Sequence, residues 1–88
     1  MSIKTVYLDV RDPYEFASGH VKGALNYPPA ELMQDLPDKL ASLPIETELV
    51  VYCASGGRAE MAIEFLRRHG FYKTFNGINQ EFVEMHFL

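Results

Sequence analysis

One segment limits the fold more than any other: a short apolar run that leads through a glycine-containing loop into an amphipathic helix. The run Glu48–Tyr52 (ELVVY) contains adjacent β-branched residues and predicts a strand that is buried on both faces. The segment Arg58–His69 has apolar residues at helical spacing. A doubly buried strand that leads directly into such a helix is typical of an α/β domain with a parallel sheet.

The remaining segments alternate in the same way. Three further strands are predicted, over residues 6–10, 24–27 and 71–75, and Asn76-Gly77 follows the last one. A short helix is expected after the N-cap Asp12, two short helical pieces within residues 30–43 on either side of Pro37, and a last helix over residues 80–85. Right-handed crossovers between parallel strands then place helices on both faces of the sheet.

Size and composition predict a single domain over residues 1–88 and narrow the classes of partner. Eight Lys and Arg stand against twelve Asp and Glu, which gives a net charge of −4 and argues against a nucleic-acid partner. The single cysteine, Cys53, excludes an internal disulfide and a multi-cysteine zinc site. The three histidines have no metal-ligand spacing, so we expect no metal and no cofactor.

No targeting segment is expected. Residues 1–5 do not combine a basic start with a long apolar stretch, so no signal peptide is predicted. The longest apolar stretch, residues 49–54, is far shorter than the roughly 20 residues of a membrane span. We therefore expect a cytoplasmic protein that has no membrane partner.

The loop after the central strand carries the candidate chemistry. Cys53 follows the strand directly, where ligands of open α/β sheets bind. Gly56 and Gly57 allow backbone N–H groups to turn toward one point, and the helix N-terminus adds unpaired N–H groups. These features favour a bound anion and a thiolate at Cys53. Arg58 in the first helical turn opposes the helix dipole, which something negative in the loop would explain.

Simpler interpretations stay open at this point. Cys53 is also compatible with a buried core thiol, and Arg58 with a surface charge paired to Glu15, Glu60 or Asp12. His20 fits a structural hydrogen bond in a turn better than acid–base chemistry.

The spacing within the loop separates two reaction classes. Four residues separate Cys53 from Arg58, whereas cysteine phosphatases place five between their cysteine and arginine. The shorter loop encloses a smaller anion, such as a persulfide sulfur, better than a phosphoryl group. Tyr52 stands where phosphatases commonly have a histidine, and no carboxylic general acid is evident just beyond the loop.

The chain resembles the single-domain form of the rhodanese (thiosulfate sulfurtransferase) family over nearly its whole length. The resemblance rests on three motifs in order: 8–11 (LDVR, then Glu15-Phe16), 19–28 (GHVKGALNYP) and 51–58 (VYCASGGR). It implies a three-layer domain with a mainly parallel five-stranded sheet and helices on both faces. Two departures are Ala59, where the family often has Ser or Thr, and residues 77–79 (GIN), where it has a Gly-Gly segment.

The resemblance assigns roles within the loop. It makes Cys53 the catalytic residue and implies that the rest of the loop binds substrate, namely Ala54, Ser55, Gly56, Gly57 and Arg58. The implied activity transfers a sulfane sulfur from thiosulfate or a persulfide, through a Cys53 persulfide, to a thiophilic acceptor such as a protein thiol. We expect a monomer or weak homodimer. The alternatives are a rhodanese-like binding or regulatory module and, less favoured, a cysteine-dependent phosphatase or arsenate-type enzyme.

Overall fold

The structure is a computed structural model that describes residues 4–88. Residues 1–3 lie outside it, and with them part of the opening segment used to predict the absence of a signal peptide. The described elements follow in the order β1 (Thr5–Asp9), α1 (Pro13–Ala17), β2 (Leu25–Asn26), α2 (Pro29–Gln34), α3 (Asp38–Ala41), β3 (Glu48–Tyr52), α4 (Gly57–Arg68), β4 (Thr74–Ile78) and α5 (Gln80–His86).

The sheet is parallel, and its strands lie in the order β2-β1-β3-β4. Five consecutive pairs join β1 to β3, from Thr5 opposite Glu48 to Asp9 opposite Tyr52. Residues 4–88 thus form four strands, one fewer than the resemblance implied. Each of the four overlaps one of the predicted β-rich runs, and the segments between them fold as helices and short connections.

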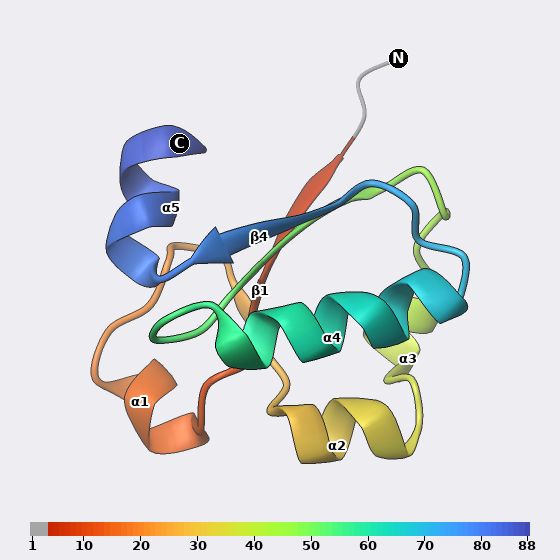
Figure 1. Ribbon diagram of the computed structural model, residues 1–88, viewed down its shortest axis with the longest axis horizontal. Coiled ribbons are helices and arrows are strands. Elements are labelled where there is room, and N and C mark those ends of the chain that lie inside the picture. The colour runs from red at the N-terminus through yellow and green to blue at the C-terminus, as the bar shows by residue number, and fades with distance from the viewer. Residues whose placement is uncertain (1–3) are drawn as a thin grey trace.

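Helices cover both faces of the sheet, as expected. One core cluster joins β1 and β3 to α2, α3 and α4, with Leu49 and Val51 facing it. The second cluster contains Val50 and Tyr52 from the opposite face of β3, together with Val83 of α5. Figure 1 shows the corresponding arrangement, with α2, α3 and α4 on one side and α1 and α5 at the left of the view. The alternation of β3 residues between the clusters confirms that this strand is buried on both faces.

The helix boundaries follow the predicted signals. Asp12 is the N-cap of α1, and its N–H donates to Glu15 Oε1 at 3.0 Å. Pro37 separates α2 from α3 and stands at the N-cap of α3. At the C-terminal end of α4, Gly70 has a left-handed φ of 99°, which lets the chain turn back toward β4.

The predicted position of β4 was wrong by three residues. The strand covers Thr74–Ile78 rather than 71–75, and Asn76-Gly77 lies inside it rather than after it. Phe71 instead packs in the core, 2% exposed. A Cβ on Gly77 would lie 2.5 Å from Val83 Cγ2, so the glycine allows α5 to pack closely on the strand.

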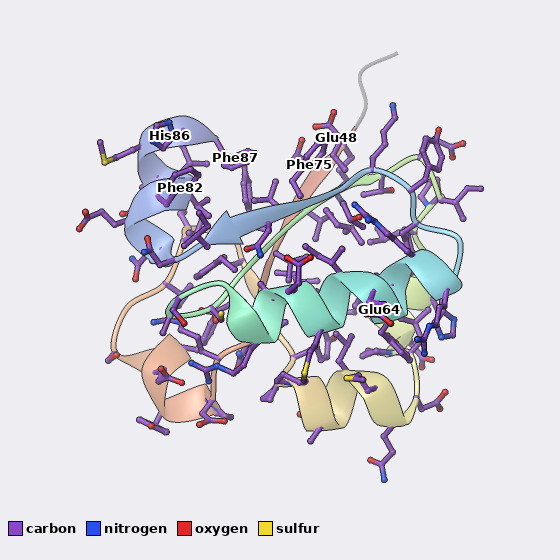
Figure 2. The ribbon with its side chains drawn as sticks, in the orientation of Figure 1. Glu48, Glu64, Phe75, Phe82, His86 and Phe87 are labelled. Carbon is purple, nitrogen blue, oxygen red and sulfur yellow. The ribbon has the colours of Figure 1, made fainter. Side chains whose placement is uncertain are left out.

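The last helix folds back over the edge strand. The ring of Phe87, just after α5, lies 6.4 Å from the ring of Phe75 in β4, and the two side chains are neighbours in Figure 2. Tyr7 Oη donates to the Phe87 carbonyl at 3.2 Å, which ties the C-terminal end to β1. No helix within residues 4–88 combines the length and the apolar character that crossing a membrane requires.

Candidate active site

The loop from Cys53 to Arg58 lies at a switch in the sheet's connectivity. From β1 the chain first moves outward to β2, and it later returns to β3 on the other side of β1. Such a reversal leaves a crevice beyond the carboxyl ends of the two central strands, where open α/β sheets bind ligands. Cys53 directly follows β3 and therefore lies at this crevice.

The thiol of Cys53 is held within the loop by backbone N–H groups. Its side chain is 1% exposed, and the N–H of Gly56 donates to Sγ at 3.0 Å. The N–H of Cys53 itself donates to the Ile78 carbonyl at 3.1 Å, which fixes the residue against β4. The sulfur atom is therefore buried, but it still accepts a hydrogen bond from the backbone.

The pKa of the Cys53 thiol lies below its ordinary value. Burial raises this pKa, but the backbone N–H groups of Ala59, Ser55, Gly56 and Arg58 together lower it by more. The expected thiolate at the N-terminus of α4 thus has a specific cause in the curled loop. A core thiol without such donors would instead have a raised pKa.

Gly56 makes the curl possible, and Asn76 supports it from the neighbouring strand. Gly56 has a φ of 96°, a conformation that L side chains rarely adopt. Asn76 Nδ2 donates to the Gly56 carbonyl at 3.1 Å, while its Oδ1 accepts from the N–H of Ile78 at 2.9 Å. Sequence reasoning missed this role because it placed Asn76 beyond the end of the strand.

The segment 77–79, noted above as a departure, supports the loop in another way. Ile78 has a φ of 70°, a left-handed value that is uncommon for a β-branched residue, and its carbonyl accepts the Cys53 N–H. Asn79 then caps α5, with Oδ1 accepting from the N–H of Phe82 at 2.8 Å.

Arg58 forms an ion pair with Glu15 of α1. Its Nη1 lies 3.0 Å from Oε1 and its Nη2 3.4 Å from Oε2. The hydrogen bond from Arg58 is the largest cause that lowers the pKa of Glu15, and Glu15 in turn raises the pKa of Arg58. The pairing of Arg58 with Glu15, one of the simpler interpretations of this arginine, is thus present. Arg58 also lies close enough to the loop for the charge of Cys53 to raise its pKa.

A second arginine lies beside the thiol and was not assigned a site role from the sequence. Arg11 Nη2 lies 2.6 Å from the buried carboxylate of Asp9 and donates to the Gly19 carbonyl at 2.7 Å. The guanidinium lies over the Tyr52 ring, 5.6 Å from its centroid. These contacts fix the Arg11 guanidinium at the edge of the site.

An open pocket of about 450 Å³ adjoins Cys53. The side chains that line it come from the end of β1, the loop and α5: Arg11, Cys53, Ala54, Asn79, Gln80, Glu81 and Glu84. No carboxylic general acid is evident in the sequence just after the loop, but two carboxylates from a later segment line the pocket. The fold brings Glu81 and Glu84 in from α5, a contact that spacing within the loop cannot reveal.

The other predicted residues take distinct positions. Ala54, Ser55 and Gly57 are exposed on the loop, while Gly56 is buried beneath it. His20 has the structural role expected for it: Nδ1 lies 2.8 Å from the Phe16 carbonyl, and the ring stacks on Phe16. Within residues 4–88, no three His, Cys, Asp or Glu side chains are grouped so that they could hold a metal ion.

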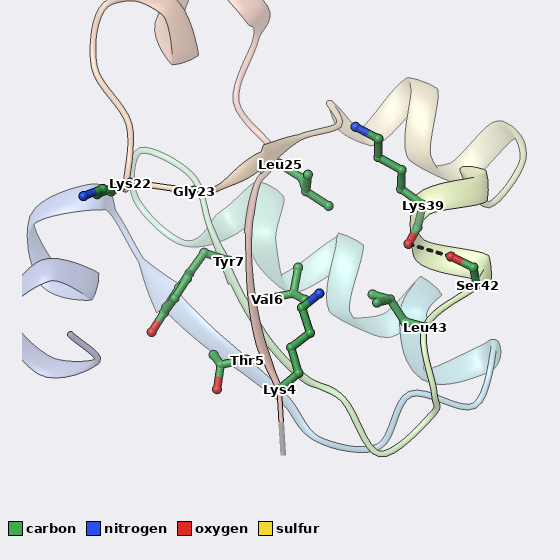
Figure 3. A pocket seen from close by; sticks show the side chains of 10 residues that line it. All are labelled: Lys4, Thr5, Val6, Tyr7, Lys22, Gly23, Leu25, Lys39, Ser42 and Leu43. Atoms are coloured by element: carbon green, nitrogen blue, oxygen red, sulfur yellow. Dashed lines mark hydrogen bonds between the residues drawn. The ribbon is translucent and has the colours of Figure 1, made fainter. Parts of the chain in front are cut away.

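A different pocket, of about 520 Å³, lies at the opposite end of the sheet. Figure 3 shows it along the start of β1, where Lys4, Thr5, Val6 and Tyr7 contribute to its lining. Cys53 follows the carboxyl end of a parallel strand, so this pocket is remote from the thiol. The pocket that Cys53 lines is the smaller one, described above.

Comparisons with known proteins agree with this geometry. The model of the rhodanese-like domain family matches residues 1–79. A solved structure described as a rhodanese with anions from E. coli superposes with a TM-score of 0.75 and 26% identity, covering 88% of each chain. A single-domain sulfurtransferase of Saccharomyces cerevisiae superposes with a TM-score of 0.71 and 27% identity, covering 97% of this chain and 78% of that one.

Curated relatives carry two different names. A sulfurtransferase of Allochromatium vinosum is 32% identical over 69 residues, which cover 78% of this chain and 61% of that protein. A tRNA uridine(34) hydroxylase of Cronobacter sakazakii is 33% identical over 73 residues, 81% of this chain. The chain spans only about one fifth, 21%, of the hydroxylase's length.

Proposed function

This chain belongs to the rhodanese-like domain family, and from that premise we propose that it is a sulfurtransferase that acts through a persulfide on Cys53. Family membership and the relatives named sulfurtransferase support a transferase. The observation that carries the proposal is the 3.0 Å contact between the Gly56 N–H and Cys53 Sγ, together with the lowered thiol pKa. An activated thiolate under a ring of N–H donors is suited to accept one sulfur atom.

The first half-reaction forms the enzyme persulfide. The Cys53 thiolate attacks the sulfane sulfur of thiosulfate or of a persulfide, R–S–S⁻. A bond forms between Cys53 Sγ and that sulfur, and the donor's S–S bond breaks with its electron pair leaving on sulfite or on R–S⁻. Charge balances, because the single negative charge of the thiolate reappears on the terminal sulfur of the Cys53 persulfide.

The second half-reaction passes the sulfur on. A thiophilic acceptor attacks the terminal sulfur, and Cys53 leaves as the thiolate. The N–H groups of Ser55, Gly56, Arg58 and Ala59 that lower the thiol pKa are placed to stabilise this leaving thiolate. Arg58 would add a positive charge at the edge of the loop.

The acceptor and the wider context are further proposals. We propose a thiophilic acceptor such as a protein thiol, a cytoplasmic location, no nucleic-acid or membrane partner, and a monomer or weak homodimer. The tRNA uridine(34) hydroxylases are far longer than this chain, so their reaction is not transferred to it.

A phosphatase is the second candidate, and the two carboxylates beside Cys53 are the observation in its favour. Glu81 or Glu84 could serve as the general acid that a phosphatase needs. Against it stands the loop, in which Sγ already contacts the N–H of Gly56 and little room is left for three phosphoryl oxygens. A binding module without chemistry would not need a thiol of lowered pKa.

One paired assay tests the proposal. The intact mass is measured after incubation with thiosulfate and, separately, with glutathione persulfide, and hydrolysis of an aryl phosphate is followed alongside. We expect a gain of one sulfur atom, its absence in Cys53→Ser, and negligible phosphate hydrolysis. Ready hydrolysis without any sulfur gain would reject the sulfurtransferase and establish the phosphatase.

A further inference from the structure

The pocket beside Cys53 has an acidic rim. Glu81 and Glu84 are exposed on α5 and line the pocket together with the thiol. Gln80 Nε2 donates to Glu84 Oε2 at 3.1 Å, which holds that carboxylate along the helix. Neither glutamate takes part in the ion pairs found within residues 4–88. Their charges therefore act on whatever enters the pocket.

The two arginines beside the thiol are already paired. Arg58 is bound by Glu15, and Asp12 adds a further negative charge near it. Arg11 is bound by Asp9, whose side chain is fully buried. In the described part of the chain, the cations that line the pocket or act on the thiol thus each face a carboxylate.

This distribution of charge disfavours a small dianion as the incoming sulfur donor. Thiosulfate carries two negative charges, which the two carboxylates that line the pocket repel, on a protein whose net charge is −4. A cationic ligand experiences the opposite field, which raises its rate of association at low salt. The volume of about 450 Å³ also lies in the range of pockets that hold organic ligands larger than a single small anion.

We propose that the preferred sulfur donor is a persulfide carried in a positively charged peptide segment, and that Glu81 and Glu84 select it. The inference rests on the proposed sulfurtransferase function and specifies its donor. The peptide's basic side chains face the two glutamates while its sulfane sulfur meets Cys53. The S–S bond of the donor breaks as the bond to Cys53 Sγ forms, and the peptide leaves as a thiolate that takes a proton from water.

The test compares donors of the same size and opposite charge. Two short synthetic peptides carry a persulfidated cysteine flanked either by lysines or by glutamates, and thiosulfate is the third donor. The measured quantity is the second-order rate at which Cys53 gains one sulfur atom, at low and at high salt. At low salt we expect the lysine peptide to react about tenfold or more faster than the glutamate peptide, and the ratio to fall toward one at high salt.

The variant Glu81→Gln/Glu84→Gln removes both charges and leaves Cys53 and its loop unchanged. We expect it to slow the lysine peptide and to speed thiosulfate, each by about five- to tenfold at low salt. The matched control, Asp35→Asn/Glu46→Gln, removes two exposed charges away from the pocket. It should change both rates by less than about twofold, and circular dichroism checks that both variants are folded.

The possible results separate the inference from the function on which it rests. Sulfur gain with every donor at equal rates, unaffected by the loss of Glu81 and Glu84, would overturn the donor assignment and leave sulfur transfer standing. So would equal effects in the two double variants, since they would show a response to net charge alone. Failure of all three donors to add sulfur would refute the sulfurtransferase itself.

Discussion

Arg58 at the start of α4 and Glu15 in α1 face one another across the edge of the loop, with Nη1 3.0 Å from Oε1. Their side chains are 35% and 23% exposed, so the pair is reached by solvent. An ion pair this exposed contributes at most about 1 kcal/mol to stability. The larger effect of the pair is on the charge of Arg58, which is proposed to act on the substrate. Glu15 partly neutralises this charge in the resting protein.

Replacement of Arg58 should affect turnover more than folding. In Arg58→Ala, the loss of a charge-assisted contact should cost on the order of 2–3 kcal/mol of transition-state stabilisation, measured as kcat/KM for sulfur transfer. Arg58→Lys should recover only part of it, because lysine lacks the planar fork. Arg68→Ala is the control, since it removes an exposed pair with Glu64 at the far end of α4. Equal losses in the Arg58 and Arg68 variants would contradict a role in the site.

The pH dependence of Cys53 alkylation should report its lowered pKa. The rate with iodoacetamide should follow an apparent pKa below the value of about 8.5 for a free thiol. The lowered pKa of Cys53 also makes the stability of the folded protein depend on pH. Between the folded and unfolded pKa values the unfolded chain binds more protons, so the free energy of unfolding rises with pH across that window. Cys53→Ser should lack this rise, and an identical pH profile in both proteins would refute a stabilised thiolate.

Asn76 should control the thiol from a distance. Asn76→Ala removes the donor to the Gly56 carbonyl and the acceptor for the Ile78 N–H. The loop should then hold Sγ less well, so we expect the alkylation pKa of Cys53 to rise and sulfur transfer to slow. If only thermal stability falls while the pKa stays unchanged, Asn76 supports the fold without tuning the thiol.

The hydroxyl of Tyr52 should be needed for stability. Tyr52 Oη accepts from the N–H of Val21 at 2.9 Å, and burial raises the pKa of Tyr52 to about 12. Tyr52→Phe leaves a buried N–H without a partner, which should cost about 1–3 kcal/mol in urea unfolding. Tyr72→Phe, at a side chain 60% exposed, should change little. Equal midpoints for the two variants would show that water replaces the lost bond.

The glycine at position 77 should tolerate no side chain. In Gly77→Ala the new Cβ would lie 2.5 Å from Val83 Cγ2 and 3.1 Å from Val50 Cγ1, so α5 must move away from β4. We expect a loss of about 1–3 kcal/mol. Gly57→Ala is the matched control, because its Cβ meets nothing within 4 Å. That variant should be neutral or slightly more stable, and a comparable loss there would implicate glycine removal in general.

Local signals predicted most of the elements that position Cys53. The run at 48–52 and the cap at Asp12 reproduce β3 and the start of α1, because both depend on neighbouring residues. The strand β4 was misplaced, because Asn76-Gly77 is a common turn sequence and its place in the sheet depends on tertiary contacts with Gly56 and Val83.

The same distinction holds for the site. Cys53 and its loop are contiguous, so their geometry could be inferred from a strand, two glycines and a helix start. The pairing of Arg58 with Glu15 could be named only as one of several options, since the choice depends on where α1 packs. Glu81 and Glu84 reach the pocket from a helix that begins 27 residues after Cys53, and spacing alone gives no sign of them.

The all-parallel sheet also determines when the thiol acquires its surroundings during synthesis. Thr5 of β1 meets Glu48 of β3 across 43 residues, so the central pairing must wait for a long loop to close. The Cys53 loop leaves the ribosome before β4, which supplies the Ile78 carbonyl and the Asn76 side chain. Until residues 74–78 dock, the loop lacks these two supports, so the ring of N–H groups around Sγ takes its final geometry only after β4 has been synthesised.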